Sequence, residues 1–479
     1  LTLKLSENVM KNLFFILLIV CYANLNLESA AQEKVNTNTF THSSLSEKVN
    51  FSTFFSDKTL RLDYIFSGDV HKQDISLSEM VLWDQWVGRR HNLNKLPLLG
   101  NGDIRVRDLK TQKTIYRTSF SSLFQEWILT PEAKQRSRAF ENCFQIPMPL
   151  HDAEVEIILR NAHQDTIADF IHPISPKDIL IRKVDAASSQ KKTAHEYIQI
   201  SNNSKAETTV DASQMPWHDP KQAIDVAIVA EGYTADEMDT FKEDAKMAIR
   251  SITSYAPFSK YSNRFNFLVV CSPSIDSGVT IPRNGEWKET AVSSHFDTFY
   301  SRRYLTTQRL KKLHNLLAGF PYEHIIVLAN TDTYGGGGIY NSYTLTTAHH
   351  ALFWPVVTHE FGHSFGGLAD EYAYANAGDD SYYPSDREPW EPNITTLHNF
   401  KAKWKDMLSK GCSIPTPTPN ATSADIHSTT KLGVYEGAGY QEKGTYRSTP
   451  DCRMRTNDAK AFCPVCQRAL TRIINFYTK

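Results

Sequence analysis

The chain has 479 residues, more than one hydrophobic core usually organises, so two domains are expected. Its hydrophobic content of 41% and charged content of 22% are those of an ordinary globular protein. The 52 Lys and Arg residues nearly balance the 53 Asp and Glu residues. This balance argues against nucleic acid or an anionic membrane surface as a partner.

The N-terminal region has the pattern of a secretory signal peptide. Met10 opens a short basic segment, the apolar run LFFILLIV (Leu13–Val20) follows, and small residues stand at Ser29 and Ala31. We expect translation to begin at Met10 and residues 1–31 to be removed as a signal peptide. The apolar run is too short to span a bilayer, and no later segment is long and apolar enough to do so. An exported protein is expected, whether secreted, periplasmic or on the cell surface.

Cysteine usage fits an oxidising compartment. Cys21 would suit a lipid anchor, but Val20 stands where a lipoprotein signal wants a small residue, so lipidation is not expected. The six other cysteines are Cys143, Cys271, Cys412, Cys452, Cys463 and Cys466. The sequence CPVC (Cys463–Cys466) lacks the second CxxC of many structural zinc sites and the strand–helix setting of a redox pair. A disulfide is therefore the expected state of this pair.

The segment up to about residue 200 is strand-like. Apolar and polar residues alternate in TLRLDYIF (Thr59–Phe66), IRVRDL (Ile104–Leu109) and AEVEIILR (Ala153–Arg160), as they do in half-buried antiparallel strands. We predict a β-sandwich-like domain over residues 32–205. The polar stretch Ser201–Gln214 is interpreted as the linker that follows it.

Beyond the linker, strands alternate with helices, which predicts an α/β (α+β) domain over residues 206–479. The expected buried strands are Ile224–Gly232, Arg264–Val270 and His324–Asn330. Thr234 and Glu237 have the spacing of a capping box at the start of a helix. A second helix is expected over Gln308–Gly319, and a glycine-rich turn opens the β-prone segment Gly335–Thr347.

The stretch THEFGHSFGGLADEY (Thr358–Tyr372) has the spacing of a zinc site. On a helix His359 and His363 lie one turn apart, so both imidazoles can reach one ion. Glu360 can then lie beside a water molecule on that ion. Zinc lowers the pKa of such a water and polarises a carbonyl, while the carboxylate takes the proton. The sequence therefore predicts a catalytic Zn²⁺ with Glu360 as general base.

A catalytic zinc site needs a third protein ligand. In the extended form of this motif that position falls three residues after Gly366, on Ala369, which cannot bind metal. Gly367 offers the same turn one residue later and leads to Asp370, the predicted ligand. Glu371 is the competing candidate. More distant acids stand in a proline-broken segment that does not predict a helix: Glu388 and Glu391.

The motif HEFGHSFGGLADEY resembles the catalytic motif of the bacterial IgA-peptidase family of secreted zinc metallopeptidases. The resemblance extends to VAIVAEGYT (Val226–Thr234), GAGYQEKGTYRSTPDCRM (Gly437–Met454) and FCPVC (Phe462–Cys466). It covers the second half of the chain densely. The first half is similar, through softer motifs, to the β-rich domain that precedes catalytic domains in that family.

This resemblance implies a metzincin-like fold and assigns roles to individual residues. His359, His363 and Asp370 would be the zinc ligands and Glu360 the catalytic base. Met454 looks like the methionine of a Met-turn, the apolar floor beneath the metal. The spacing to Asp370 is one residue longer than in the general metzincin pattern.

Other residues in this half have two interpretations each. Gly335–Thr347 is either the edge strand that pairs with an extended substrate or an ordinary surface hairpin. Tyr372, Tyr440 and Tyr446 are candidates for stabilising the oxyanion of a tetrahedral intermediate. The pair His349 and His350 is interpreted as surface or packing residues.

These patterns predict an exported zinc endopeptidase that acts on a protein or glycoprotein substrate, and the family resemblance suggests immunoglobulin A. Two alternatives belong to other classes. One is a non-catalytic adhesin on a peptidase scaffold, which would have no use for a base beside the metal. The other is a zinc hydrolase of amide-bearing glycans. Cleavage assays with and without a chelator distinguish the adhesin from the predicted endopeptidase. A sugar-substrate screen distinguishes the glycan hydrolase from it.

Overall fold

The computed structural model describes residues 48–185, 194–200, 207–210, 218–219, 222–374, 382–420 and 422–479. The predicted signal peptide and Cys21 lie outside these residues, as does most of the predicted linker. Within the described part, none of the helices has the length and hydropathy needed to cross a bilayer.

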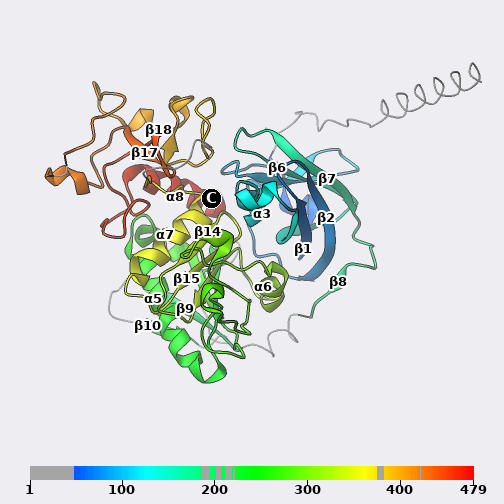
Figure 1. Cartoon of the computed structure of the whole chain (residues 1–479). Helices are drawn as coiled ribbons and strands as arrows, with labels where there is room; N and C mark the ends of the chain where they lie inside the picture. Colours follow the sequence, from blue (N-terminus) through cyan, green and yellow to red (C-terminus); the bar gives the residue numbers. More distant parts are fainter. Residues whose placement is uncertain are drawn as a thin grey trace, which may run out of the picture. The chain divides into compact units, whose positions relative to one another are not determined.

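Two four-stranded sheets form the N-terminal β-rich region (Figure 1). The first has the order β5-β1-β2-β8, with β1 Phe55–Gly68, β2 Gln73–Asp84, β5 Arg138–Pro149 and β8 Arg182–Lys183. The second has the order β4-β3-β6-β7, with β3 Gly102–Asp108, β4 Thr114–Phe120, β6 Ala153–Arg160 and β7 Thr166–Ile174. All three strands expected here from alternation are confirmed, as β1, β3 and β6.

The two sheets face each other across an aromatic core. Phe120 of β4 lies against Phe66 and Phe144 of the first sheet, with ring centroids 6.0 and 4.4 Å apart. Arg61 and Asp63 on the other face of β1 are also buried, and helix α6 (Leu310–Leu316) contacts this face through Asn315. There Arg61 pairs with Asp63 at 2.8 Å and donates to Asn315 Oδ1 at 2.8 Å. The β-rich region is thus packed onto the second half of the chain.

A seven-stranded mixed sheet organises the second half, in the order β10-β9-β12-β11-β13-β15-β14. Its strands are β9 Ala194–Ile200, β10 Glu207–Val210, β11 Ile224–Glu231, β12 Phe265–Cys271, β13 His324–Ala329, β14 Gly336–Ile339 and β15 Tyr343–Thr347. Strands β12, β11, β13 and β15 run parallel, and β14 closes one side antiparallel to β15. The three predicted buried strands are confirmed as β11, β12 and β13.

The predicted linker is partly strand. β10 lies inside it, and β9 lies before residue 205 yet pairs with β12 of this sheet. The polar composition of the linker concealed β10, and no local pattern showed that β9 pairs with the sheet of the second half. The boundary between residues 205 and 206 remains a prediction.

Helices cover both faces of this sheet because its central strands are apolar on both. On one side Val226 and Ile228 of β11 pack under α5 (Met238–Ser254), α7 (Phe353–Gly366) and α8 (Pro464–Thr478). On the other side Ala227 and Val229 share a core with α6 and the β-rich region. The capping box is confirmed, since Glu237 accepts a hydrogen bond from the Thr234 amide at 2.8 Å, immediately before α5.

A small fourth sheet follows, made of β16 (Ile394–Thr395), β17 (Tyr435–Ala438) and β18 (Gln441–Arg447). The segment between β18 and α8 carries Met454 and two of the cysteines, Cys452 and Cys463. It lies against the C-terminal end of α7, where the candidate site is found.

Candidate metal centre

Helix α7 carries the predicted histidines on one face. Pro355 stands in its first turn, where a proline needs no amide partner. The helix ends at Gly367, whose φ of 57° is the left-handed conformation that glycine adopts most readily. This turn brings the chain back toward the histidines, as the spacing to Asp370 predicts.

The two histidines are held in a defined orientation by backbone carbonyls. Nδ1 of His359 donates to the Arg453 carbonyl at 2.9 Å, and Nδ1 of His363 donates to the Leu368 carbonyl at 2.6 Å. Each neutral ring therefore keeps a lone pair on Nε2. The two Nε2 atoms are 3.0 Å apart, and Asp370 Oδ1 lies 3.0 Å from His359 Nε2 and 3.3 Å from His363 Nε2.

When both rings are neutral and Asp370 is ionised, the three converging atoms are all acceptors. Such an arrangement is repulsive unless a cation lies between the atoms. Ligands bonded to zinc at 2.0–2.1 Å with tetrahedral angles lie about 3.3 Å apart, close to the separations here. The residues therefore fit a divalent metal such as zinc.

Asp370 is prepared for this role by its surroundings. The side chain is 5% exposed, and its Oδ2 accepts a hydrogen bond from the Tyr440 hydroxyl. Without a metal, burial opposes ionisation of Asp370, yet positive charge and hydrogen bonds from the facing imidazoles hold the pKa of its carboxyl well below the usual range. Asp370 is therefore a carboxylate with one oxygen fixed and the other directed at the histidines.

Glu360 lies next to this triad, between α7 and strand β14. A Cβ at Gly336 would lie 3.0 Å from Glu360 Oε1, and a Cβ at Gly338 would lie 2.3 Å from the Glu360 carbonyl oxygen. Glycines here let the strand pack directly on the helix. Burial raises the pKa of the Glu360 carboxyl.

Met454 lies beneath the helix turn between the two histidines. It is fully buried, and a Cβ at Gly362 would meet its sulfur at 2.8 Å. Any side chain larger than that of glycine at position 362 would displace this methionine.

The competing acids are placed elsewhere. Glu371 points away from the histidines: its Oε1 accepts from Asn393 Nδ2 at 3.0 Å and lies 3.1 Å from Cys466 Sγ. Glu391 accepts from the Tyr383 hydroxyl at 3.1 Å, and Glu388 pairs with Lys403 at 3.8 Å. Of the four acids considered as a third ligand, the fold brings only Asp370 to the two histidines.

The disulfide expected at CPVC is wrong. Cys463 and Cys466 are both free thiols. The reason is local, because Cys463 caps the start of α8 and its sulfur accepts the Cys466 amide at 3.3 Å.

A cavity of about 820 Å³ opens in front of the triad. Its lining includes Tyr372 and Tyr440, but Tyr446 lies outside it and contacts Glu436. Strand β14 lines the cavity through Gly336, Gly337 and Gly338. The amide of Gly336 already donates to the Arg303 carbonyl at 3.2 Å, so one end of this strand is paired.

The cavity wall also contains residues that the sequence did not single out. Glu126, from helix α3 (Leu123–Ile128) of the β-rich region, accepts a hydrogen bond from the Tyr304 hydroxyl. Burial raises the pKa of Glu126 to about 7. Arg303 donates to the Tyr374 hydroxyl at 2.6 Å. No motif marks these residues, because only the packing of the two regions brings them together.

Comparison with protein families gives an independent result. The profile of the family described as IgA Peptidase M64 matches residues 216–426 and 419–474, and that of the Peptidase M64 N-terminus matches residues 50–171. No curated protein matches the chain in sequence. The first profile covers more than half of the chain, including the helix with its two histidines and most of the residues that line the cavity. The chain therefore belongs to the M64 family of IgA peptidases, and it is a protease.

Proposed function

We propose that this peptidase is an exported zinc endopeptidase that cleaves proteins or glycoproteins, with immunoglobulin A as the first candidate substrate. One observation carries the proposal: His359, His363 and Asp370 bring three potential ligand atoms within 3.3 Å of one another beside Glu360, at one wall of a large cavity. In this proposal a metzincin-like catalytic domain over residues 206–479 follows a β-sandwich-like domain.

His359, His363 and Asp370 would hold the zinc ion. Zinc bound there would supply Lewis acidity, polarising the scissile carbonyl and acidifying water. Glu360 would take a proton from the attacking water and deliver it to the nitrogen of the leaving amine. The Glu360 carboxylate suits both steps because it is adjacent to the triad and lines the cavity.

Tyr372 is the better candidate for stabilising the oxyanion. The Tyr440 hydroxyl is engaged by Asp370, so Tyr440 acts as a positioning residue for that ligand. Tyr446 does not line the cavity. We expect an extended substrate to lie along β14, where the glycines carry no side chains that would cover the backbone.

The cavity wall favours one second candidate, hydrolysis of amide-bearing glycans. Several tyrosines line the cavity, and rings with a polar tip can pack against the faces of sugars as well as against peptides: Tyr304, Tyr334, Tyr340, Tyr372, Tyr374, Tyr382, Tyr383 and Tyr440. Activity on such sugars and none on protein would favour this candidate.

The test compares wild type with Glu360→Gln and Asp370→Ala. Zinc would be quantified, and cleavage of immunoglobulin A and a mucin-type glycoprotein followed. We expect Glu360→Gln to keep its zinc and lose cleavage, and Asp370→Ala to lose the zinc of this site. Glu388→Gln is the matched control and should keep both zinc and activity. Zinc-loaded wild type that cuts neither protein would contradict the proposal.

A further inference from the structure

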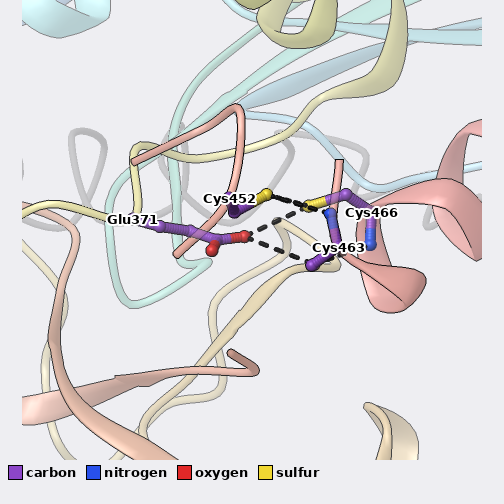
Figure 2. Close-up of side chains that lie close together, drawn as sticks. All are labelled: Glu371, Cys452, Cys463 and Cys466. Atoms are coloured by element: carbon purple, nitrogen blue, oxygen red, sulfur yellow. Dashed lines mark hydrogen bonds between the residues drawn. The ribbon is translucent and has the colours of Figure 1, made fainter. Parts of the chain in front are cut away.

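A second group of possible metal ligands lies beside the first but faces away from the cavity. Glu371, Cys452, Cys463 and Cys466 converge so that one ligand atom from each lies within 4.8 Å of the others (Figure 2). All four side chains are buried. They come from three separate places: the loop after α7, the Met454 segment and the first turn of α8.

The separations are those of a tetrahedral zinc site with sulfur ligands. Sulfur atoms bonded to zinc at 2.3 Å lie about 3.8 Å apart at tetrahedral angles. The Sγ atoms of Cys452 and Cys466 are 3.8 Å apart, far beyond the length of a disulfide bond. Glu371 Oε1 lies 3.1 Å from Cys466 Sγ and 3.9 Å from Cys463 Sγ.

Backbone amides are arranged to stabilise thiolates here. Cys452 Sγ accepts from the amides of Cys463 at 3.2 Å and Met454 at 3.5 Å. Cys463 Sγ accepts from the Cys466 amide at 3.3 Å, at the positive end of the α8 dipole. Amide donors and a helix N-terminus both favour negative charge on sulfur.

Glu371 adds a buried carboxyl group with one oxygen that is not hydrogen-bonded. Its Oε2 is buried and has no hydrogen-bond partner among the described residues, while Oε1 is shared with Asn393 and the thiols. A buried carboxylate oxygen without a partner is costly. A cation among the three sulfurs would remove that cost.

We propose that Glu371, Cys452, Cys463 and Cys466 bind a structural zinc ion. Four protein ligands fill a tetrahedral shell and leave no open position, which distinguishes structural from catalytic zinc. Binding transfers the three thiol protons to solvent as the thiolates coordinate. The second CxxC that the sequence lacks is replaced by Cys452 and Glu371.

This ion fixes the segments that build the site described above. Glu371 follows Asp370 directly, and its amide donates to the Met454 carbonyl at 2.8 Å. Cys452 lies two residues before Met454. A metal that holds Glu371, Cys452 and the start of α8 together therefore positions Asp370 and the floor under the histidines. It does so whichever substrate the cavity accepts.

The experiment uses the full mature chain, wild type and variants, loaded with Zn²⁺ or Co²⁺. Wild type is expected to bind two ions, and its Co²⁺ form to absorb through thiolate-to-metal charge transfer. Cys466→Ser should lose one ion and most of that absorption. His363→Ala should lose the other ion and keep the absorption. Cys143→Ser, which alters a buried thiol in the β-rich core, is the matched control and should change neither.

The absorption in wild type and in His363→Ala does not depend on whether a cysteine variant folds. Its absence from both would overturn the proposal, as would an intact mass two hydrogens below that of the reduced chain, which reveals a disulfide. Cleavage is not the readout, so failure of the peptidase proposal would leave this one standing.

Discussion

Two adjacent carboxylates, Asp370 and Glu371, point to two different clusters. Asp370 joins the imidazoles of α7 at the wall of the cavity, whereas Glu371 joins three buried thiols on the other side of the same loop. The first cluster has three protein donors beside a cavity with room for substrate. The second has four donors in a closed interior.

In the two proposals above, one loop contributes a ligand to each of two different sites. A three-donor set beside a cavity can accept a reacting group, while a closed set of four can only hold the chain. The loop after α7 connects the two clusters directly, because Asp370 and Glu371 are consecutive residues. Whatever fixes Glu371 therefore limits where Asp370 can go.

The largest expected effect comes from removing the base at the open cluster. Glu360→Gln should lower kcat/KM about 10²- to 10⁴-fold, because proton transfer by a positioned carboxylate contributes that much to rate. Metal content at both clusters should stay unchanged. Steady-state kinetics with metal analysis would check this, and residual activity within a few-fold of wild type would exclude Glu360 as the base.

Replacing each of the two carboxylates by alanine in turn sharpens the comparison of the two clusters. Asp370→Ala should remove the ion of the histidine cluster and keep the thiolate absorption of the Co²⁺ form. Glu371→Ala should remove the ion of the thiol cluster and keep the ion of the histidine cluster. It should also weaken metal binding at the histidines about 10- to 100-fold, the usual cost of losing a supporting group. Competition with a metal-sensitive dye would measure both affinities. Equal behaviour of the two variants would mean that the clusters are not separate.

A smaller effect is expected at the support of Asp370. Tyr440→Phe removes the hydroxyl that donates to Asp370 Oδ2 and keeps the ring. Metal affinity at the histidine cluster should fall roughly tenfold. This is the lower end of the loss usually seen when a hydrogen bond that supports a metal ligand is removed. The thiol cluster should be unaffected. A fall in thiolate absorption would show that Tyr440 supports the whole loop and not Asp370 alone.

The smallest effect concerns the turn that ends α7. Gly367→Ala should lower the free energy of unfolding by about 1 kcal/mol, because φ of 57° disfavours a side chain. Metal affinity should also fall, since the new Cβ would lie 2.6 Å from Leu98 Cδ1. Gly411→Ala is the control: it has φ of 86° but open space around it. Denaturant unfolding and metal titration of both variants would separate backbone strain from displacement of the loop.

Local patterns predicted much of the fold and most of the first cluster. The strands β1, β6 and β11 follow from alternation and apolar runs, and α7 places His359 and His363 by helical spacing alone. Gly367 gave the position of the turn before Asp370. These features depend on residues close together in sequence, where the physical rules are strongest.

The second cluster could not be predicted in this way. Glu371, Cys452 and the CPVC pair meet only after α7, the Met454 segment and α8 have packed together. The sequence suggested a disulfide between Cys463 and Cys466. It could not show that Glu371 and Cys452 lie beside these sulfurs in the folded chain. Glu126 and strand β9 were missed for the same reason, since each gains its role from a distant partner.

The most direct test is a pair of anomalous diffraction data sets, recorded above and below the zinc absorption edge from crystals of the zinc-loaded mature protein. We predict two peaks that vanish below the edge. One lies between His359 Nε2, His363 Nε2 and Asp370 Oδ1, and the other lies among Glu371 and the sulfurs of Cys452, Cys463 and Cys466. A map with no zinc peak at the histidines, or with one at the histidines and none at the thiols, would contradict the assignment of the two carboxylates to separate ions.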